Sequence, residues 1–95
     1  MDDWLDSINK YRHIKEFADL CEDVLKLRNY HNSHQDADMM NHIRLLMVKY
    51  PEETINWNSS HCEAPKDLEQ EYWITEEFLR SVAFVKLSKM VAGSC

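Results

Sequence analysis

Glycine is almost absent from this chain: Gly93 is the only one among 95 residues, and Pro51 and Pro65 are the only prolines. Tight hairpin turns need residues that adopt positive φ, and glycine does so at the lowest steric cost. A sheet built from hairpins is therefore disfavoured, and helices joined by polar loops are favoured. Phosphate-cradling loops also depend on glycine, so P-loop and dinucleotide-binding motifs are excluded.

Apolar residues recur every three or four positions through most of the chain, which is the period of an amphipathic helix. The pattern predicts a short helix over residues 3–9, capped by Asp2 or Asp3, and a longer one over residues 10–30 that is either separate or continuous with it. Acidic and basic residues of the longer helix, Asp23 included, are expected largely on its solvated side. Its buried face is expected to contain Ile14, Phe17, Ala18, Leu20, Cys21, Val24, Leu25 and Leu27.

The middle of the chain predicts a third helix followed by a loop. The helix is expected over residues 36–50, capped by Asp36 or Asp38 and ended by Pro51. Residues 51–65 have no clear apolar period and are predicted to form one long irregular loop with room for a single helical turn. Loops of this length in compact domains are often functional. The buried face of the third helix is expected to contain Met39, Met40, Ile43, Leu46, Met47 and Tyr50.

The C-terminal third predicts two more helices, over residues 66–73 and 75–92, the second capped by Thr75. Trp73 is expected to close the core between them. The last helix is apolar almost all round, which is typical of a helix that is central in a bundle or shared with a second chain. Residues 1–95 are therefore predicted to form a single all-α domain, a compact bundle of four to five helices.

The net charge and the cysteines of the chain indicate which classes of function are favoured and which are disfavoured. Seventeen acidic against eleven basic residues give a formal net charge of −6. Nucleic-acid affinity comes largely from Lys and Arg neutralising phosphates, so direct DNA or RNA binding is disfavoured and a protein partner with a basic surface is favoured. Cys21, Cys62 and Cys95 form no C-x-x-C pair, and neither a signal peptide nor a membrane span is evident. A cytoplasmic protein without a cofactor is expected.

One alternative is a metal-dependent hydrolase. His31, His34, Asp38 and His42 are spaced by three, four and four positions, so an unbroken helix would place them on one face. Imidazole and carboxylate groups are ligands of zinc and other transition metals. The competing interpretation, which we favour, is a set of polar linker histidines with His42 at the edge of the core.

A second enzymatic alternative comes from residues 28–34, RNYHNSH, in which an arginine precedes a histidine by six positions. This segment resembles the short motif of the HEPN ribonuclease superfamily, whose members are also helical. The resemblance covers seven residues. It implies that Arg28 supports the scissile phosphate and that His34 performs acid–base chemistry, with Asn29 orienting them. The competing interpretation places Arg28 at the negative end of a helix, where a cation is stabilising.

The overall profile favours a non-enzymatic binding protein. Immunity proteins, antitoxins and phage-encoded inhibitors are also small, acidic and compact, and they act by occupying a partner's surface. Aromatic residues surrounded by charge are typical of such contact surfaces. The predicted partner-binding residues are Glu52, Glu53, Trp57, Glu63, Glu69, Glu71 and Tyr72. A third hypothesis, a structural homo-oligomer, would join copies through Phe84, Leu87 and Val91.

Overall fold

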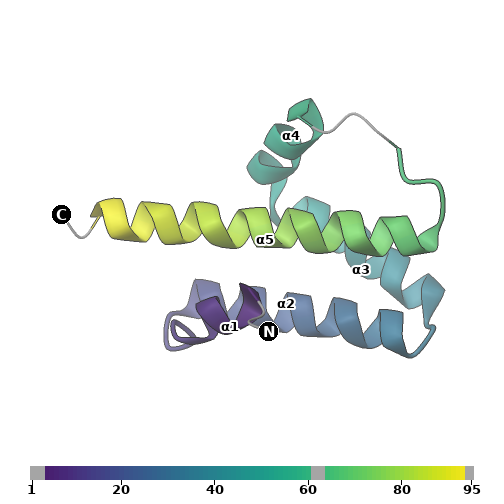
Figure 1. Cartoon of the computed structure of the whole chain (residues 1–95), viewed down its shortest axis with the longest axis horizontal. Coiled ribbons are helices and arrows are strands. Elements are labelled where there is room, and N and C mark those ends of the chain that lie inside the picture. The colour runs from purple at the N-terminus through teal and green to yellow at the C-terminus, as the bar shows by residue number, and fades with distance from the viewer. Residues whose placement is uncertain (1–3, 61–63, 94–95) are drawn as a thin grey trace.

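Helices account for nearly all of the chain that the computed structural model describes, namely residues 4–60 and 64–93. In these residues there is no strand, and five helices follow one another (Figure 1). They are α1 (Trp4–Asn9), α2 (Lys15–Asn32), α3 (Asp36–Lys49), α4 (Pro51–Ser60) and α5 (Leu68–Gly93). The predicted all-α bundle is confirmed.

The core lies between α2, α3 and α5. α2 and α5 run side by side in opposite directions, α1 folds back onto α2, and α4 lies on the side of α5 that faces away from α2 (Figure 1). Burying a large aliphatic side chain stabilises the fold by about 1.5–3 kcal/mol, so this apolar interior is the main driving force for folding. Its largest fully buried side chains are Ile8, Leu20, Cys21, Val24, Leu27, Met39, Leu46, Leu79 and Val82.

The first two helices are separate. α1 ends at Asn9 and α2 begins at Lys15, and the turn between them includes a hydrogen bond from the Tyr11 amide to the Ile8 carbonyl (3.0 Å). Ile14, the N-cap residue of α2, has extended backbone angles and no side-chain capping bond. The turn lets α1 pack against α2 instead of extending it. Asp2 and Asp3, the predicted caps of α1, lie outside the described residues.

α2 ends in a Schellman motif built around a histidine. The Gln35 amide donates to the Tyr30 carbonyl (2.9 Å), and the His34 amide donates to the His31 carbonyl (3.2 Å). His34 takes the positive φ (58°) that this motif usually assigns to glycine. The connection between α2 and α3 is therefore shorter than the predicted helices over residues 10–30 and 36–50 imply, because α2 continues to Asn32. α3 starts after Gln35, which makes no side-chain capping bond.

The predicted caps of α3 are wrong, because Asp36 and Asp38 lie within its first turn. There their negative charges complement the positive end of the helix. Its predicted buried face is largely confirmed by Met39, Ile43, Leu46 and Tyr50. Met47, by contrast, is 45% exposed.

The predicted loop over residues 51–65 is wrong in its first ten residues, which form α4. Pro51 takes the first helical position, where its missing amide hydrogen costs nothing. Tyr50 ends α3 and also starts α4, since its carbonyl accepts from the Thr54 amide (3.0 Å) and hydroxyl (2.7 Å). No residue of α4 is buried. Because α4 buries no residue, the sequence of α4 shows no apolar period.

The two helices predicted over residues 66–73 and 75–92 are one continuous helix, α5. The hydroxyl of Thr75 donates to the Glu71 carbonyl one turn earlier (2.7 Å), so Thr75 is an interior residue and not a cap. The cap is Asp67, whose carboxylate accepts from the Gln70 amide (2.8 Å). The Gln70 side chain accepts in return from the Lys66 amide (2.8 Å), which resembles a capping box.

Over the described residues, none of the helices combines the length and apolar character that crossing a bilayer demands.

Candidate functional site

A pocket of about 610 Å³ lies where α3, α4 and α5 meet. This volume is within the range of sites that hold small molecules or the anchoring groups of a partner. The greater part of its wall is apolar. The apolar lining residues are Ile43, Leu46, Met47, Trp57, Pro65, Ile74 and Phe78, and the polar ones are Thr54, Asn58, Ser60, Glu71 and Thr75.

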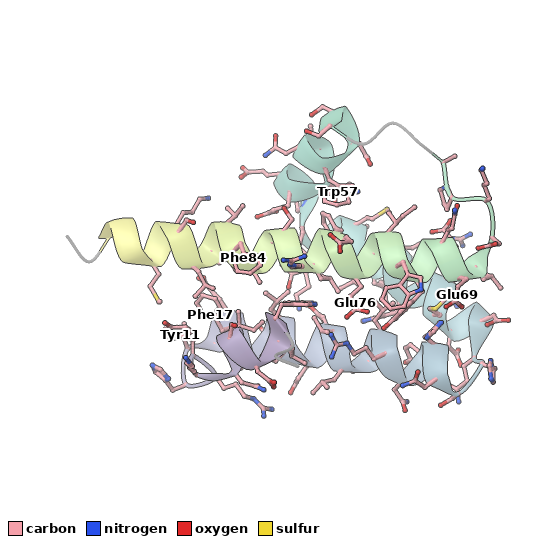
Figure 2. The ribbon with its side chains drawn as sticks, viewed as in Figure 1. Tyr11, Phe17, Trp57, Glu69, Glu76 and Phe84 are labelled. Carbon is pink, nitrogen blue, oxygen red and sulfur yellow. The ribbon has the colours of Figure 1, made fainter. Side chains whose placement is uncertain are left out.

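The pocket exists because α4 rests on the bundle through very few side chains. Trp57 points from α4 toward α5 (Figure 2) and meets Phe78 edge-on, with ring centroids 6.0 Å apart. The indole is half-buried, and every other residue of α4 is either half-buried or exposed. The bulky ring holds α4 away from α5, so the space beside it stays open.

Three of the five polar residues that line the pocket, Thr54, Glu71 and Thr75, offer only acceptors to it, and the other two, Asn58 and Ser60, can also donate. The hydroxyl of Thr54 donates to the Tyr50 carbonyl and that of Thr75 donates to the Glu71 carbonyl, both at 2.7 Å. Each hydroxyl has one proton, so both present only lone pairs to an incoming group. Glu71 is the one charged residue in the described lining of the pocket. The pocket is therefore apolar with an anionic, accepting edge.

A smaller hollow of about 250 Å³ adjoins the pocket. Trp57, Ser60 and Phe78 line both hollows. Among its described lining residues, two carboxylates, Glu52 and Glu53, outnumber the single cation, Lys89. The acidic character of the pocket edge thus continues past Trp57.

A buried polar network joins α2 to α3. The Asp23 carboxylate accepts from Lys49 Nζ (2.8 Å) and from the Tyr50 hydroxyl (3.0 Å), and the Asp23 carbonyl accepts from His42 Nε2 (3.0 Å). Burial, followed by the charge and hydrogen bond of Asp23, raises the pKa of Tyr50. The prediction that Asp23 lies on the solvated side of α2 is wrong, because its carboxylate connects two helices. These groups satisfy one another and have a structural role.

The C-terminal end of α2 meets the N-terminal end of α5 through His31. Its ring stacks on Tyr72 with centroids 3.8 Å apart and 8° between planes, and its Nε2 lies 2.9 Å from Glu69 Oε2. The other oxygen of Glu69 accepts from the Trp73 indole (3.1 Å). The hydrogen bond with His31 is the main reason that the pKa of Glu69 is lowered. Trp73 is 55% exposed, so the prediction that it closes the core is wrong.

Arg28 and Glu76 form an ion pair across the α2–α5 interface. Arg28 Nε donates to Glu76 Oε1 at 2.9 Å, Arg28 Nη2 contacts the same oxygen, and the guanidinium lies 5.9 Å from the Trp4 ring centroid. Glu76 is buried and points from α5 toward α2 (Figure 2). Burial, and next the hydrogen bond and charge of Glu76, raise the pKa of Tyr72.

The residues of the two enzymatic alternatives are held in separate environments. His31 pairs with Glu69, His42 is buried against the Asp23 carbonyl, His34 forms the turn after α2, and Asp38 is exposed. Within residues 4–60 and 64–93, no group of three or more His, Cys, Asp or Glu side chains could hold a metal ion. The metal site predicted as an alternative is therefore not assembled.

The HEPN-like segment is likewise used for packing. Arg28 is engaged by Glu76 within the bundle, and His34 supplies the positive φ of the Schellman motif. Asn29 accepts the Ser33 amide through its carbonyl (2.9 Å), as an ordinary helical residue does.

Most of the predicted partner-binding residues lie near the two hollows. Glu52, Glu53 and Trp57 come from α4, and Glu71 comes from the first turn of α5. Glu69 belongs to the same turn, but it lines neither hollow and contacts His31 of α2 instead. The three α4 residues and Glu71 are far apart in the sequence, and the contacts of α4 with α3 and α5 bring them to one region.

One of those predictions needs revision. Tyr72 is buried beneath His31, so it is not available as a surface contact. Glu63 lies outside the described residues. The sequence did not indicate Met47, Ile74 or Phe78 as pocket residues, because a helical period shows only that a residue faces inward. Of the predicted oligomer contacts, Phe84 is 44% exposed, Leu87 is partly buried against the core, and the side chain of Val91 lies outside the description.

Comparison of the chain with protein-family models, with curated proteins and with solved structures gave no match. What the protein binds must therefore be inferred from the chemistry of its own surface.

Proposed function

We propose that this chain is a non-enzymatic binding protein that acts by occupying the surface of a partner protein, as immunity proteins, antitoxins and phage-encoded inhibitors do. The observation that carries this proposal is the apolar pocket beside Trp57, in which Glu71 is the charged residue of the described lining. Tryptophan is enriched among the residues that dominate binding energy at protein interfaces. The apolar wall supplies affinity, and the carboxylates supply selection for a basic partner.

The charge of the whole chain supports the same proposal. A net charge of −6 attracts a basic partner over a distance and accelerates its association, in a way that added salt weakens. Glu52 and Glu53 in the adjoining hollow continue this negative potential. We place the protein in the cytoplasm, where a buried thiol such as that of Cys21 stays reduced.

The proposal is tested by photo-crosslinking in cells of the source organism. A photoreactive residue replaces Asn58, which lines the pocket, or Asn41, an exposed residue on α3 that serves as the matched control. We expect position 58 to capture one defined protein and position 41 not to capture it. The identified partner is then purified, and its dissociation constant is measured with the wild-type chain and with Trp57→Ala.

Trp57→Ala is expected to weaken that complex at least about tenfold, since truncation of a central aromatic anchor costs on the order of 2 kcal/mol. Because no residue of α4 is buried, the bundle should stay folded, and circular dichroism checks this. Equal capture from both asparagine positions, or an unchanged dissociation constant, would refute the proposal.

A further inference from the structure

The carboxylate of Glu71 is the strongest clue to the chemistry of the group that enters the pocket. Glu71 is half-buried as a residue, and among the described residues no Lys, Arg or His pairs with its carboxylate. Its helical neighbours are also unsuited to pairing: Asp67 precedes it by four positions, and Ile74 and Thr75 follow it. A cation placed beside an unpaired carboxylate at an apolar wall would form a charge-assisted hydrogen bond and would be stabilised.

The other polar groups of the pocket select in the same direction. The Thr54 and Thr75 hydroxyl protons are committed to backbone carbonyls, which leaves lone pairs facing the pocket. An ammonium or guanidinium group would find the Glu71 carboxylate and these two hydroxyl oxygens as acceptors. An anionic group would be repelled by Glu71 and would find donors only on the uncharged side chains of Asn58 and Ser60. Phosphate, sulfate and carboxylate ligands are therefore disfavoured.

The apolar wall determines the rest of the occupant. The space is lined by aliphatic and thioether side chains, among them Ile43, Met47 and Ile74, and by the rings of Trp57 and Phe78. About 610 Å³ is enough for more than one large apolar side chain. Neighbouring apolar and basic side chains at helical spacing occur together on a basic amphipathic helix.

Resting on the binding role proposed above, we infer that the pocket between α3, α4 and α5 receives a basic amphipathic helix of the partner protein. Large apolar side chains of that helix pack against Trp57 and Phe78, and a neighbouring Lys or Arg pairs with Glu71. The carboxylates of Glu52 and Glu53 attract further basic residues of the same segment.

Three synthetic fluorescent peptides of equal length test this inference by fluorescence anisotropy. The first carries leucines at helical spacing i, i+3, i+4 and i+7 with lysine elsewhere. The second replaces every lysine by glutamate. The third keeps the lysines and leucines of the first but scrambles their order, so that the apolar stripe is lost while the charge is retained.

We expect the first peptide to bind at least about tenfold more tightly than either of the others, which corresponds to about 1.4 kcal/mol. Glu71→Lys should weaken binding of the first peptide at least about tenfold. Glu22→Lys makes the same change of net charge on the exposed face of α2, away from the pocket, and should weaken it less than about threefold. Circular dichroism and thermal unfolding confirm that both variants are folded.

Each contrary result has a distinct meaning. Equal weakening by Glu71→Lys and Glu22→Lys would show that net charge alone attracts the peptide, and equal binding of the scrambled peptide would show that the apolar wall is not used. Either result, or no binding by any peptide, overturns the inference. Equal binding of the lysine and glutamate peptides also overturns it and removes the selection for a basic partner, but it leaves the proposed occupation of a partner's surface intact. That function is judged separately by capture from Asn58.

Discussion

The hydroxyl of Tyr50 donates a 3.0 Å hydrogen bond to the carboxylate of Asp23, 27 positions earlier in the chain. Lys49 donates to the same oxygen, and His42 donates to the Asp23 carbonyl. His42 near the middle of α3, Lys49 at its end and its C-cap Tyr50 therefore hold one turn of α2. A carboxylate on a mainly apolar interface fixes how the two helices are aligned, since only one register satisfies all of these donors.

Asp23→Ala is expected to lower the free energy of unfolding by about 2–3 kcal/mol, because it leaves the buried Tyr50 hydroxyl without an acceptor and removes a charge-assisted bond. Urea denaturation followed by circular dichroism measures the change. The adjacent Glu22 is exposed and makes a matched control. Glu22→Ala should change stability by less than about 0.5 kcal/mol. Similar losses in both variants would contradict a structural role of the Asp23 network.

Stability is expected to fall in alkaline solution because the pKa values of Tyr50 and Tyr72 are raised in the folded chain. The folded state holds these phenolic protons more tightly than the unfolded state, in which a tyrosine has a pKa of about 10. The stabilisation is therefore complete below about pH 10 and is lost as the pH rises above it.

Urea denaturation at a series of alkaline pH values measures this slope. Tyr50→Phe should make the decline above about pH 10 shallower, because phenylalanine cannot ionise. Tyr11 is the control, since its hydroxyl makes no hydrogen bond among the described residues. If the free energy of unfolding declines with pH as steeply in Tyr50→Phe as in Tyr11→Phe, the buried Tyr50 hydroxyl is not a cause of the loss of stability above about pH 10.

His34→Gly is expected to stabilise the protein by about 0.5–1 kcal/mol. A non-glycine residue at positive φ is strained, and glycine relieves that strain at a Schellman position, although it also makes the unfolded chain more flexible. His34→Ala keeps the strain and should not be stabilising. Thermal unfolding of both variants measures the difference. A loss of stability in His34→Gly would show that the imidazole makes contacts that outweigh the strain.

The sequence predicted the helices that bury a stripe of side chains. Phe17, Leu20, Val24 and Leu27 recur at helical spacing because they are buried in the core. This spacing predicted the main buried face of α2. α4 was missed because it buries nothing and so imposes no period. Thr75 suggested a helix start, but a threonine inside a helix donates to the preceding turn equally well.

The candidate site could be predicted only in part. Clustering of carboxylates around Trp57 was visible in the sequence, and the structure brings Glu52, Glu53 and Glu71 near that ring. The pocket itself depends on the tilt of α4 over α5, which the ring of Trp57 against Phe78 determines. Such a long-range contact leaves no local pattern. The same applies to Asp23, whose neighbours in the fold come from α3.

Arg28 and Glu76 are expected to be strongly coupled. Removal of one partner leaves the other charge in a largely buried site, so Arg28→Met should cost about 3 kcal/mol. The double variant Arg28→Met, Glu76→Met leaves no such charge and should be more stable than Arg28→Met alone. A double-mutant cycle by urea denaturation measures the coupling. The exposed pair Glu77 and Arg80 is the control, with an expected coupling below about 0.5 kcal/mol. Additive losses at Arg28 and Glu76 would contradict the interpretation.

α4 is expected to open locally more easily than any other part of the bundle. It buries no residue, and the contact of Trp57 with Phe78 is its principal anchor on α5, whereas α2 buries six of its residues. Helices with few buried contacts exchange amide hydrogens through local opening instead of global unfolding. Native-state hydrogen exchange should therefore give α4 amides opening free energies at least about 2 kcal/mol below those of α2.

Trp57→Ala should accelerate exchange in α4 and leave α2 almost unchanged, since it removes a contact at the edge of the core, on Phe78, and leaves the side chains that α2 buries in place. A ligand in the pocket should have the opposite effect, because it adds contacts between α4 and the bundle. If α4 and α2 amides instead exchange at the same free energy, α4 belongs to the cooperative core. The pocket would then be a rigid preformed cleft, and Trp57→Ala would lower global stability by as much as the truncation of a core residue such as Leu79.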